Sequence, residues 1–218
     1  MRNYFCGWYF KCQSDDKTLA VISAVHGSSQ SIQLITDDGA WSFTDNLKDN
    51  SFSKDGFSVK LLDSGASAFG EVRFGDCSTI KYDIMGPFKY VPFMECRHSI
   101  VSMRHRVDGM ISVNDVEYRF DNDLGYIEGD RGYSFPREYA WTQCFFDDGN
   151  SLMFSIADIP IAGWHFTGII GVILWQGKEY RFATYLGARA LKIADNEFII
   201  QQGQYRFTAR LPESVALQ

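Results

Sequence analysis

The stretch Met110-Ile-Ser-Val-Asn-Asp-Val-Glu-Tyr-Arg-Phe120 has the sequence pattern of a β-hairpin. Apolar and polar residues alternate on both sides of Asn114-Asp115, and both residue types tolerate the backbone angles of a tight turn. A second stretch, Val172-Ile-Leu-Trp-Gln-Gly-Lys-Glu-Tyr-Arg-Phe182, has the same construction around Gln176-Gly177 and ends on the same tetrapeptide. The hairpin is therefore expected to be the unit from which the fold is built.

Turn signals also punctuate the rest of the chain. They stand at Asp38-Gly39, Asp148-Gly149 and Gln202-Gly203, each beside a short run of alternating residues. No segment longer than about twelve residues keeps a 3.6-residue apolar period with caps, as a helix of ordinary length would. The sequence predicts an all-β protein with little helix. The least strand-like stretch, Pro87 to His105, is expected to be a crossover loop with one helical turn.

The chain is unusually aromatic and mildly acidic. Of its 218 residues, 16% are aromatic, with 18 Phe, 11 Tyr and 5 Trp, and the net charge is −6. Such an excess of rings fits either many strands or a ligand cavity lined with rings. Because the 21 basic residues are scattered rather than clustered, no nucleic-acid partner is expected.

The sequence also predicts the cellular location of the protein. The first residues lack the apolar core of a secretory signal, and the longest apolar run, Phe166 to Trp175, is too short to span a bilayer. The five cysteines are widely spaced and form no C-x-x-C pair. We expect a soluble, cytoplasmic protein with reduced thiols and no stable membrane insertion. No cofactor is expected, and the oligomeric state is left open.

Two similar lobes are predicted. The shared hairpins support this, as does a looser echo in which Trp8 and Trp141 each stand eleven residues before a leucine that opens an apolar run. Repeated β architectures are built in this way. The predicted lobes are residues 1–122 and 123–218.

One segment combines glycines, acids, arginine and aromatic rings more densely than the rest of the chain: Gly125-Tyr-Ile-Glu-Gly-Asp-Arg-Gly-Tyr-Ser-Phe-Pro-Arg-Glu-Tyr-Ala-Trp-Thr-Gln143. A loop that places carboxylates beside aromatic rings would use such a mixture, because glycine permits strained backbone angles and Pro136 fixes the exit. The structural alternative is an ordinary glycine-rich connection in which Glu128 or Asp130 pairs with Arg131.

This segment and the start of the chain together resemble the two signatures of the tocopherol cyclase family. The matching residues are Phe5-Cys-Gly-Trp-Tyr-Phe-Lys11, Gly125-Tyr-Ile-Glu128, Gly132-Tyr-Ser-Phe-Pro136 and Trp141-Thr-Gln143, and Ala183-Thr-Tyr-Leu-Gly-Ala188 resembles the later part of bacterial members. The family usually has glutamate at the position of Cys6 and tryptophan at that of Arg131. Its C-terminal strands are expected to be missing from this chain.

The resemblance implies a lipocalin-like (calycin-type) antiparallel barrel, related to the carotenoid 1,2-hydratases, that binds an apolar or prenyl-type small molecule. It further implies acid-initiated cyclisation or hydration of a prenyl double bond. Such a step needs a carboxylic acid in an apolar site, and rings near the carbocation that forms. Glu128 is the expected acid, Asp130 the second choice, and Gln143 is expected to orient a hydroxyl group. The expected ligand-binding residues are Trp8, Tyr126, Trp141, Tyr133, Phe135, His98, Glu95 and Cys6.

Other hypotheses stay open from the sequence alone. A non-catalytic, lipocalin-like lipid-binding protein would use the same barrel, and a structural protein would fill its interior with side chains. Glu95, Cys96 and His98 could in principle ligate a metal, but neither their spacing nor their number matches a recognised site, so no metal is expected. A structural His98 would cap the cavity or bond to a backbone carbonyl.

Overall fold

The protein is described from a computed structural model that covers residues 4–92, 94–146, 149–161, 164–194 and 196–210. Every strand pair among these residues is antiparallel, and the helical elements are short 3₁₀ turns. The prediction of an all-β fold is therefore confirmed. None of the helical turns in the described ranges is long and apolar enough to cross a membrane.

The chain forms two compact units, which are described separately. The first contains described residues 4–80 and 96–134, and the second contains those of 81–95 and 135–210. The predicted lobe boundary, between residues 122 and 123, lies inside a strand of the first unit.

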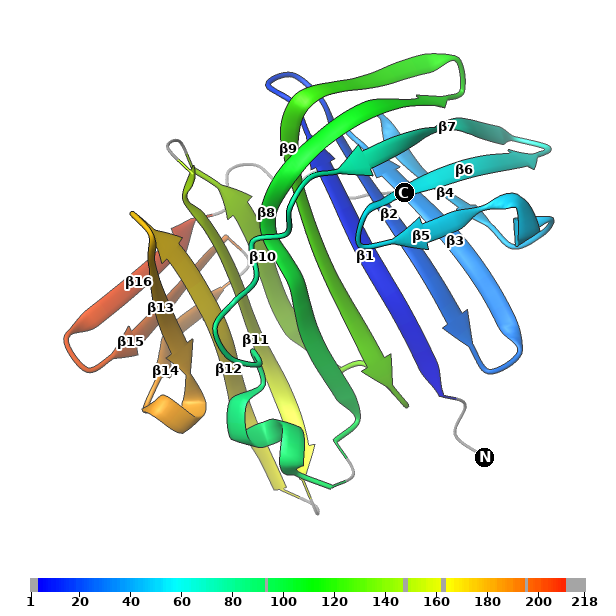
Figure 1. Ribbon diagram of the computed structural model, residues 1–218. Coiled ribbons are helices and arrows are strands. Elements are labelled where there is room, and N and C mark those ends of the chain that lie inside the picture. Colours follow the sequence, from blue (N-terminus) through cyan, green and yellow to red (C-terminus); the bar gives the residue numbers. More distant parts are fainter. Residues whose placement is uncertain (1–3, 93, 147–148, 162–163, 195, 211–218) are drawn as a thin grey trace. The chain divides into compact units, whose positions relative to one another are not determined.

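A single nine-stranded sheet makes up the first unit (Figure 1). In spatial order its strands are β4 (Gly39–Phe43), β3 (Ser29–Thr36), β2 (Thr18–His26), β1 (Phe5–Gln13), β9 (Val116–Gly132), β8 (Cys96–Val113), β7 (Ala66–Phe74), β6 (Gly56–Asp63) and β5 (Ser51–Ser53), with the 3₁₀ turn η1 (Leu47–Asp49) between β4 and β5. The long hairpin of β8 and β9 turns at Asn114 and Asp115, whose φ angles are 48° and 67°. This is the left-handed geometry that the turn pair predicts.

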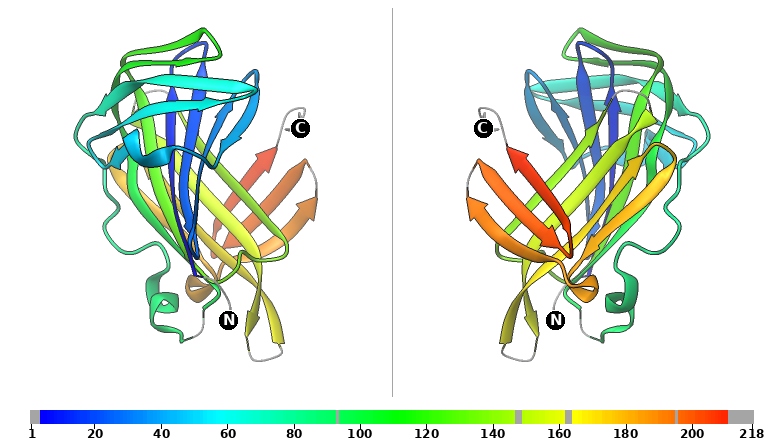
Figure 2. Two further views of the ribbon diagram at one scale, coloured as in Figure 1. Left: turned by 90° about the vertical axis from the view of Figure 1, so that its right-hand side faces the viewer. Right: turned by 90° about the vertical axis from the view of Figure 1, so that its left-hand side faces the viewer.

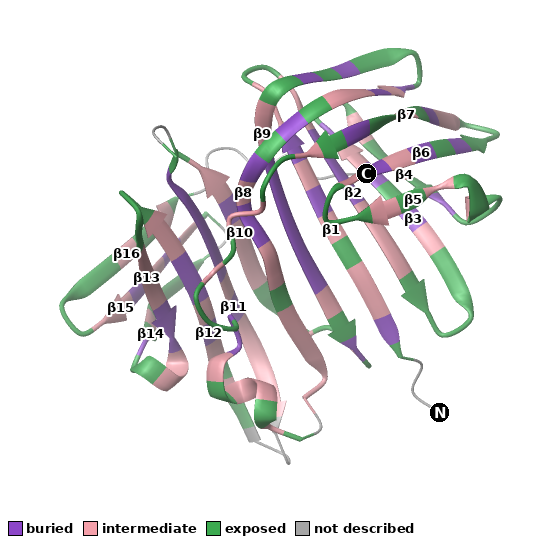
Figure 3. Cartoon of the chain, in the orientation of Figure 1, coloured by how far each residue is buried: buried purple, intermediate pink, exposed green. Residues whose placement is uncertain are grey.

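One face of this sheet is packed into an apolar core. Its buried members include Phe10, Leu34, Phe57 and Ile111, which come from four different strands, and the buried bands along the strands are visible in Figure 3. Rings fill much of the space, since Phe10 has its centroid within 6.1 Å of the centroids of Phe52, Phe57 and Phe74. The aromatic excess of this part of the chain is thus used in packing.

A β-bulge at Asn122 changes which side chains of β9 face this core. Gly109 pairs with Phe120 and Val107 with Asp123, so β9 has one more residue than β8 between these pairs. Asn122 takes a φ of 55°, and its N–H donates to Asp108 Oδ1 at 2.8 Å. A one-residue insertion reverses the alternation of a strand. Phe120 therefore faces the core before the bulge, and Ile127 does so after it.

The second unit contains two smaller sheets. Figure 2 shows the hairpin of β15 (Glu197–Gln202) and β16 (Tyr205–Arg210), which belongs to one of them, in orange to red. The first sheet has the order β10 (Tyr139–Phe145), β11 (Ser151–Ile161), β12 (Trp164–Trp175) and β13 (Lys178–Ala183), and the second has β14 (Arg189–Ala194), β15 (Glu197–Gln202) and β16 (Tyr205–Arg210). The 3₁₀ turns η2 (Gly86–Tyr90) and η4 (Thr184–Leu186) belong to the same unit. Both sheets contribute to one core, in which Phe154 and Phe207 stack with centroids 4.1 Å apart.

Two segments with loop-like composition are strands, and their prediction as loops is wrong. Residues 96–105 belong to β8, although the expected helical turn is present as η2. Residues 125–132 belong to β9. The glycine at 125 serves close packing instead of a turn, because a Cβ there would overlap the His105 ring.

Two glycines, Gly70 in β7 and Gly109 in β8, let these strands approach closely. Gly70 has a φ of 136°, and a Cβ there would overlap the carbonyl oxygen of Met110. We expect Gly70→Ala to lower the free energy of unfolding by ~1–3 kcal/mol, because both the backbone angle and the overlap oppose a side chain. Chemical denaturation checks this. Gly65→Ala is the control, since nothing lies within 4 Å of a Cβ there, and equal stability of the two variants would contradict the prediction.

Candidate active site

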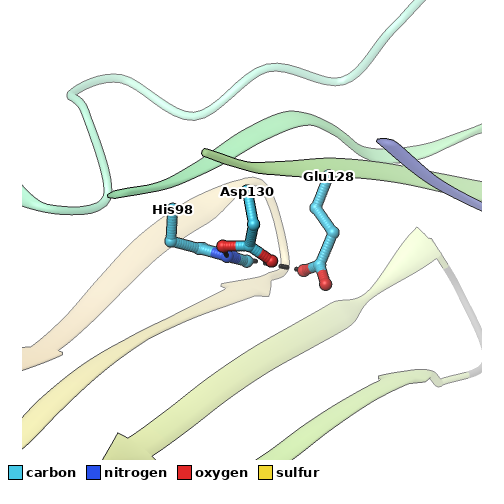
Figure 4. A group of neighbouring side chains, drawn as sticks. All are labelled: His98, Glu128 and Asp130. Carbon is cyan, nitrogen blue, oxygen red and sulfur yellow. Dashed lines mark hydrogen bonds and ion pairs between the residues drawn. The ribbon is translucent and has the colours of Figure 1, made fainter. Parts of the chain in front are cut away.

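The candidate site lies on the face of the first unit's sheet that is opposite to the core. Pairing of β8 with β9 places His98 opposite Asp130 and Ile100 opposite Glu128. Residues two apart on a strand share a face, so Tyr126, Glu128 and Asp130 project together. Figure 4 shows Glu128, His98 and Asp130 extending to the same side of the two strands. We refer to these three residues as the carboxylate–imidazole cluster.

The imidazole of the cluster lies between the two carboxylates. His98 Nδ1 is 2.8 Å from Asp130 Oδ1, and His98 Nε2 is 3.2 Å from Glu128 Oε2, an ion-pair contact that lacks the geometry of a hydrogen bond. Glu128 is only 5% exposed. Two more groups contact the cluster: Tyr126 Oη donates to Glu128 Oε2 at 2.5 Å, and Cys96 Sγ donates to Asp130 Oδ1 at 3.6 Å.

Electrostatics favour the protonated form of His98. Burial by itself lowers the pKa of the imidazole, but the charge of Glu128 and the contacts with both carboxylates outweigh it and raise the pKa to about 10. Burial, followed by the charge of Glu128, raises the pKa of the Tyr126 phenol well above its usual value and also raises that of Tyr9. The thiol of Cys96 has its pKa raised by burial and by Asp130. At neutral pH the cluster therefore holds an imidazolium beside neutral phenols.

The same three residues are the one group in the described ranges whose ligand atoms lie close enough to hold a metal ion, within 4.8 Å of one another. The imidazole, however, faces Asp130 with one nitrogen and Glu128 with the other. Each nitrogen thus has one carboxylate beside it, and a proton can be shared along either contact.

The first-unit residues of the predicted ligand-binding set are divided between the two faces of the sheet. Trp8 pairs with Gly129 and Cys6 with Arg131, so both side chains project from the face opposite to Glu128 and Asp130. Trp8 stacks on Phe10 of the core, with centroids 6.4 Å apart. Tyr133 lies beyond β9 and is 51% exposed, with its ring edge against Tyr4.

The remaining predicted residues, Trp141, Gln143, Phe135 and Glu95, belong to the second unit. Gln143 is buried in β10, and Phe135 is 52% exposed and stacks on Tyr139. The three residues of the carboxylate–imidazole cluster all belong to the first unit.

Sequence reasoning missed two features of the site. One is the pair of partners of His98: it contacts two carboxylates, whereas a cavity cap or a bond to a backbone carbonyl was expected. The other is Tyr9, which pairs with Glu128 across β1 and β9 and has its ring edge against Tyr126. The sequence did hold a signal for Tyr9. It stands next to Trp8 in the first signature, and neighbouring residues on a strand face opposite sides, so Trp8 and Tyr9 had to lie on different faces.

Two histidines of strand β8 are expected to titrate on opposite sides of neutrality. His105 is buried beside Phe74, and burial lowers its pKa to about 4, whereas that of His98 is raised to about 10. At pH 7.5 the ring signals of His98 should be those of an imidazolium and the signals of His105 those of a neutral ring. An NMR titration checks this, with H98Q and H105Q used to assign the signals. A neutral His98 at pH 7.5 would contradict the proposed charge state.

The same shifts predict how stability depends on pH. The contribution of His98 should be complete below pH 6.5, its unfolded pKa, and should be lost as the pH rises toward about 10. The contribution of a neutral His105 should be complete above pH 6.5 and lost as the pH falls toward about 4. Denaturation of H98Q and of the parent protein between pH 6 and 10 measures the first of these, and a constant difference across that range would refute it.

Comparison with known proteins finds similarity in structure only. No family model matches the chain, and no curated protein matches it in sequence. Kievitone hydratase from Nectria haematococca superposes with a TM-score of 0.57 at 8% identity, covering 94% of this chain and 74% of that one. CghA superposes with a TM-score of 0.56 at 9% identity, covering 95% and 75%. A putative AttH from Nitrosomonas europaea superposes with a TM-score of 0.47 at 10% identity, covering 95% of this chain and 79% of that one. The first two likenesses confirm the predicted fold class, an all-β, lipocalin-like fold with antiparallel strands.

Proposed function

We propose that the protein catalyses proton-initiated addition to a carbon–carbon double bond of an apolar, prenyl-type small molecule, either hydration or ring closure, with the carboxylate–imidazole cluster as the proton source. One observation carries the proposal: the largely buried imidazole of His98 lies between two carboxylates, 2.8 Å from one and 3.2 Å from the other. Buried groups that share a proton are typical of general acid–base sites.

The cluster can supply and recover one proton in each turnover. When substrate binding aligns the Nε2–H bond with Glu128, His98 passes its Nε2 proton to Glu128 and keeps the Nδ1 proton that it donates to Asp130. Glu128 then protonates one alkene carbon, and the other carbon becomes a cation. Water or a hydroxyl group of the substrate attacks this cation, and the proton that it releases returns to Glu128 and then to His98. The cluster ends the cycle with the proton count with which it began.

An apolar substrate would favour the first step. An ion pair loses solvation when water is displaced, so a neutral Glu128 and a neutral His98 become closer in energy to the charged pair. Asp130 holds the Nδ1 proton and thereby directs Nε2 toward Glu128. Tyr9 and Tyr126 lie on the same face and offer electron-rich rings to a cation.

Two independent likenesses support this reaction class. The sequence resembles the tocopherol cyclases at the strands that contain Glu128 and Tyr9, and the fold is similar to that of a protein named as a hydratase. Hydration and ring closure share the protonation step and differ only in whether water or a substrate hydroxyl attacks. The non-catalytic alternative, a lipid-binding protein, predicts binding of the same molecules without turnover.

The test is turnover of a prenylated hydroquinone in H₂¹⁸O, followed by mass spectrometry. Hydration adds the mass of labelled water, and ring closure leaves the mass unchanged but shifts the retention time. Glu128→Gln is expected to lower the rate by about 10²–10⁴-fold, the usual contribution of a general acid. Glu117→Gln is the matched control, because Glu117 lies on the same strand but is exposed and pairs with Arg119.

Three results would decide the matter. Loss of turnover in E128Q with unchanged turnover in E117Q supports the proposal. Turnover that survives E128Q places the proton source elsewhere. Binding of the hydroquinone to the parent protein with no product of either kind favours the lipid-binding alternative.

A further inference from the structure

The three-stranded sheet of the second unit, drawn in orange to red in Figure 2, has an outer face with an excess of positive charge. Its inner face packs into the core through residues of all three strands: Ala190, Phe198, Ile200, Phe207 and Ala209. Because successive residues of a strand face opposite sides, the positions between these project outward. We refer to this outer surface as the cationic face. Its charged residues among those described are four basic and one acidic: Arg189, Lys192, Arg206, Arg210 and Glu197.

Strand pairing places the basic side chains beside one another. Gln201 in β15 has Arg189 as its partner on one side and Arg206 on the other. Lys192 lies opposite Ile199, because a β-bulge in β14 skips the residue before it. Side chains of cross-strand partners lie about 5 Å apart, so the cations form one continuous surface over the three strands. The chain as a whole has a net charge of −6, so this positive charge is a local feature.

The single acid pairs with only two of the four cations. Glu197 Oε2 is 2.5 Å from Lys192 Nζ, and Glu197 Oε1 is 2.9 Å from Arg210 Nε. Arg189 and Arg206 are exposed, and no ion pair or hydrogen bond joins either side chain to another residue in the described part of the chain. Two unpaired guanidinium groups on one flat surface attract an anionic partner.

Exposed aliphatic side chains accompany these cations. Leu191 is 58% exposed and Ile193 is 56% exposed, and both belong to β14, which lies at the edge of the sheet. Leu191 is the residue that the bulge adds, and it comes directly before Lys192. Basic residues beside exposed aliphatic ones are typical of surfaces that lie against anionic bilayers. A nucleic acid would use the cations but would offer no partner to leucine and isoleucine, so a bilayer fits the face better.

We propose that the cationic face, together with Leu191 and Ile193, binds the surface of a bilayer that contains anionic lipids. The contact is peripheral. The guanidinium and ammonium groups contact the negatively charged headgroups, and the two aliphatic side chains reach the boundary between headgroups and acyl chains. Apolar molecules of the class proposed above as substrates dissolve in bilayers, but binding at this surface does not depend on that reaction.

Sedimentation of the full chain with lipid vesicles tests the charged part of the proposal. One set of vesicles is phosphatidylcholine alone, and the other is phosphatidylcholine with an equal part of phosphatidylglycerol. At about 0.1 M salt the parent protein should bind the mixed vesicles at least about ten-fold more tightly than the neutral ones. The double variant R189Q/R206Q should bind the mixed vesicles about 20–30-fold more weakly, because each cation at an anionic surface contributes about five-fold.

A second variant tests the apolar part. Leu191→Ala should weaken binding to the mixed vesicles several-fold, because it removes apolar surface that enters the interface. The dependence of binding on salt should stay as in the parent protein, since no charge changes. In R189Q/R206Q, by contrast, the dependence on salt should become weaker.

Matched controls keep the test specific. R137Q/K178Q removes two positive charges from exposed positions of the second unit that lie outside the three-stranded sheet. It should bind the mixed vesicles nearly as the parent protein does. E128Q should also bind them normally, so failure of the proposed catalytic function would leave this result intact.

The proposal is overturned if the parent protein binds neither kind of vesicle, or binds both equally. An equal loss of binding in R189Q/R206Q and R137Q/K178Q would also overturn it, because the effect would then come from net charge and not from this face. Binding to a duplex oligonucleotide that is tighter than binding to the mixed vesicles, and is lost in R189Q/R206Q, would mean that the face serves a nucleic acid instead.

Discussion

The pairing of β8 with β9 is the interaction on which the first unit depends. These two strands join β1 through β4 on one side to β5 through β7 on the other, so their register sets how the two halves of the sheet are aligned. The bulge at Asn122 then decides what each face carries. Without its extra residue, Glu128 would share a face with Phe120 and would lie among the rings of the core. With it, the core receives Ile127, and the carboxylates lie on the opposite face beside His98.

Placing two acids beside one imidazole has a physical consequence beyond geometry. Isolated buried charges are strongly unfavourable, and the cluster persists because each carboxylate contacts the same cation. A proton held in this way is kept away from bulk water and can still be relocated when the surroundings change. The two tyrosines add neutral donors and rings without adding charge. These are the properties that an acid–base site for an apolar substrate needs.

The two units use the same hairpin construction with different results. In the first, rings from most of the strands fill one core, and the carboxylate–imidazole cluster lies on the opposite face of the sheet. In the second, two short sheets share a core that is closed by Phe154 and Phe207 but is open beside Trp175 and Tyr205. The aromatic excess of the chain therefore has two uses, packing in one place and an exposed groove in the other. The two interpretations of the aromatic excess, packing between strands and a groove lined with rings, thus apply to different units.

The hairpins and the identity of the acids follow from local sequence alone. Asn114-Asp115 and Gln176-Gly177 produce tight turns through their own backbone preferences, and Glu128 and Asp130 stand out by their neighbours in the chain. Long-range pairing, by contrast, places His98 beside Glu128, 30 residues later in the chain, and puts Trp8 on the other face from Glu128. Both depend on strand register and on bulges, which long-range pairing sets. A single inserted residue reverses a strand's faces, and local sequence patterns carry no record of it.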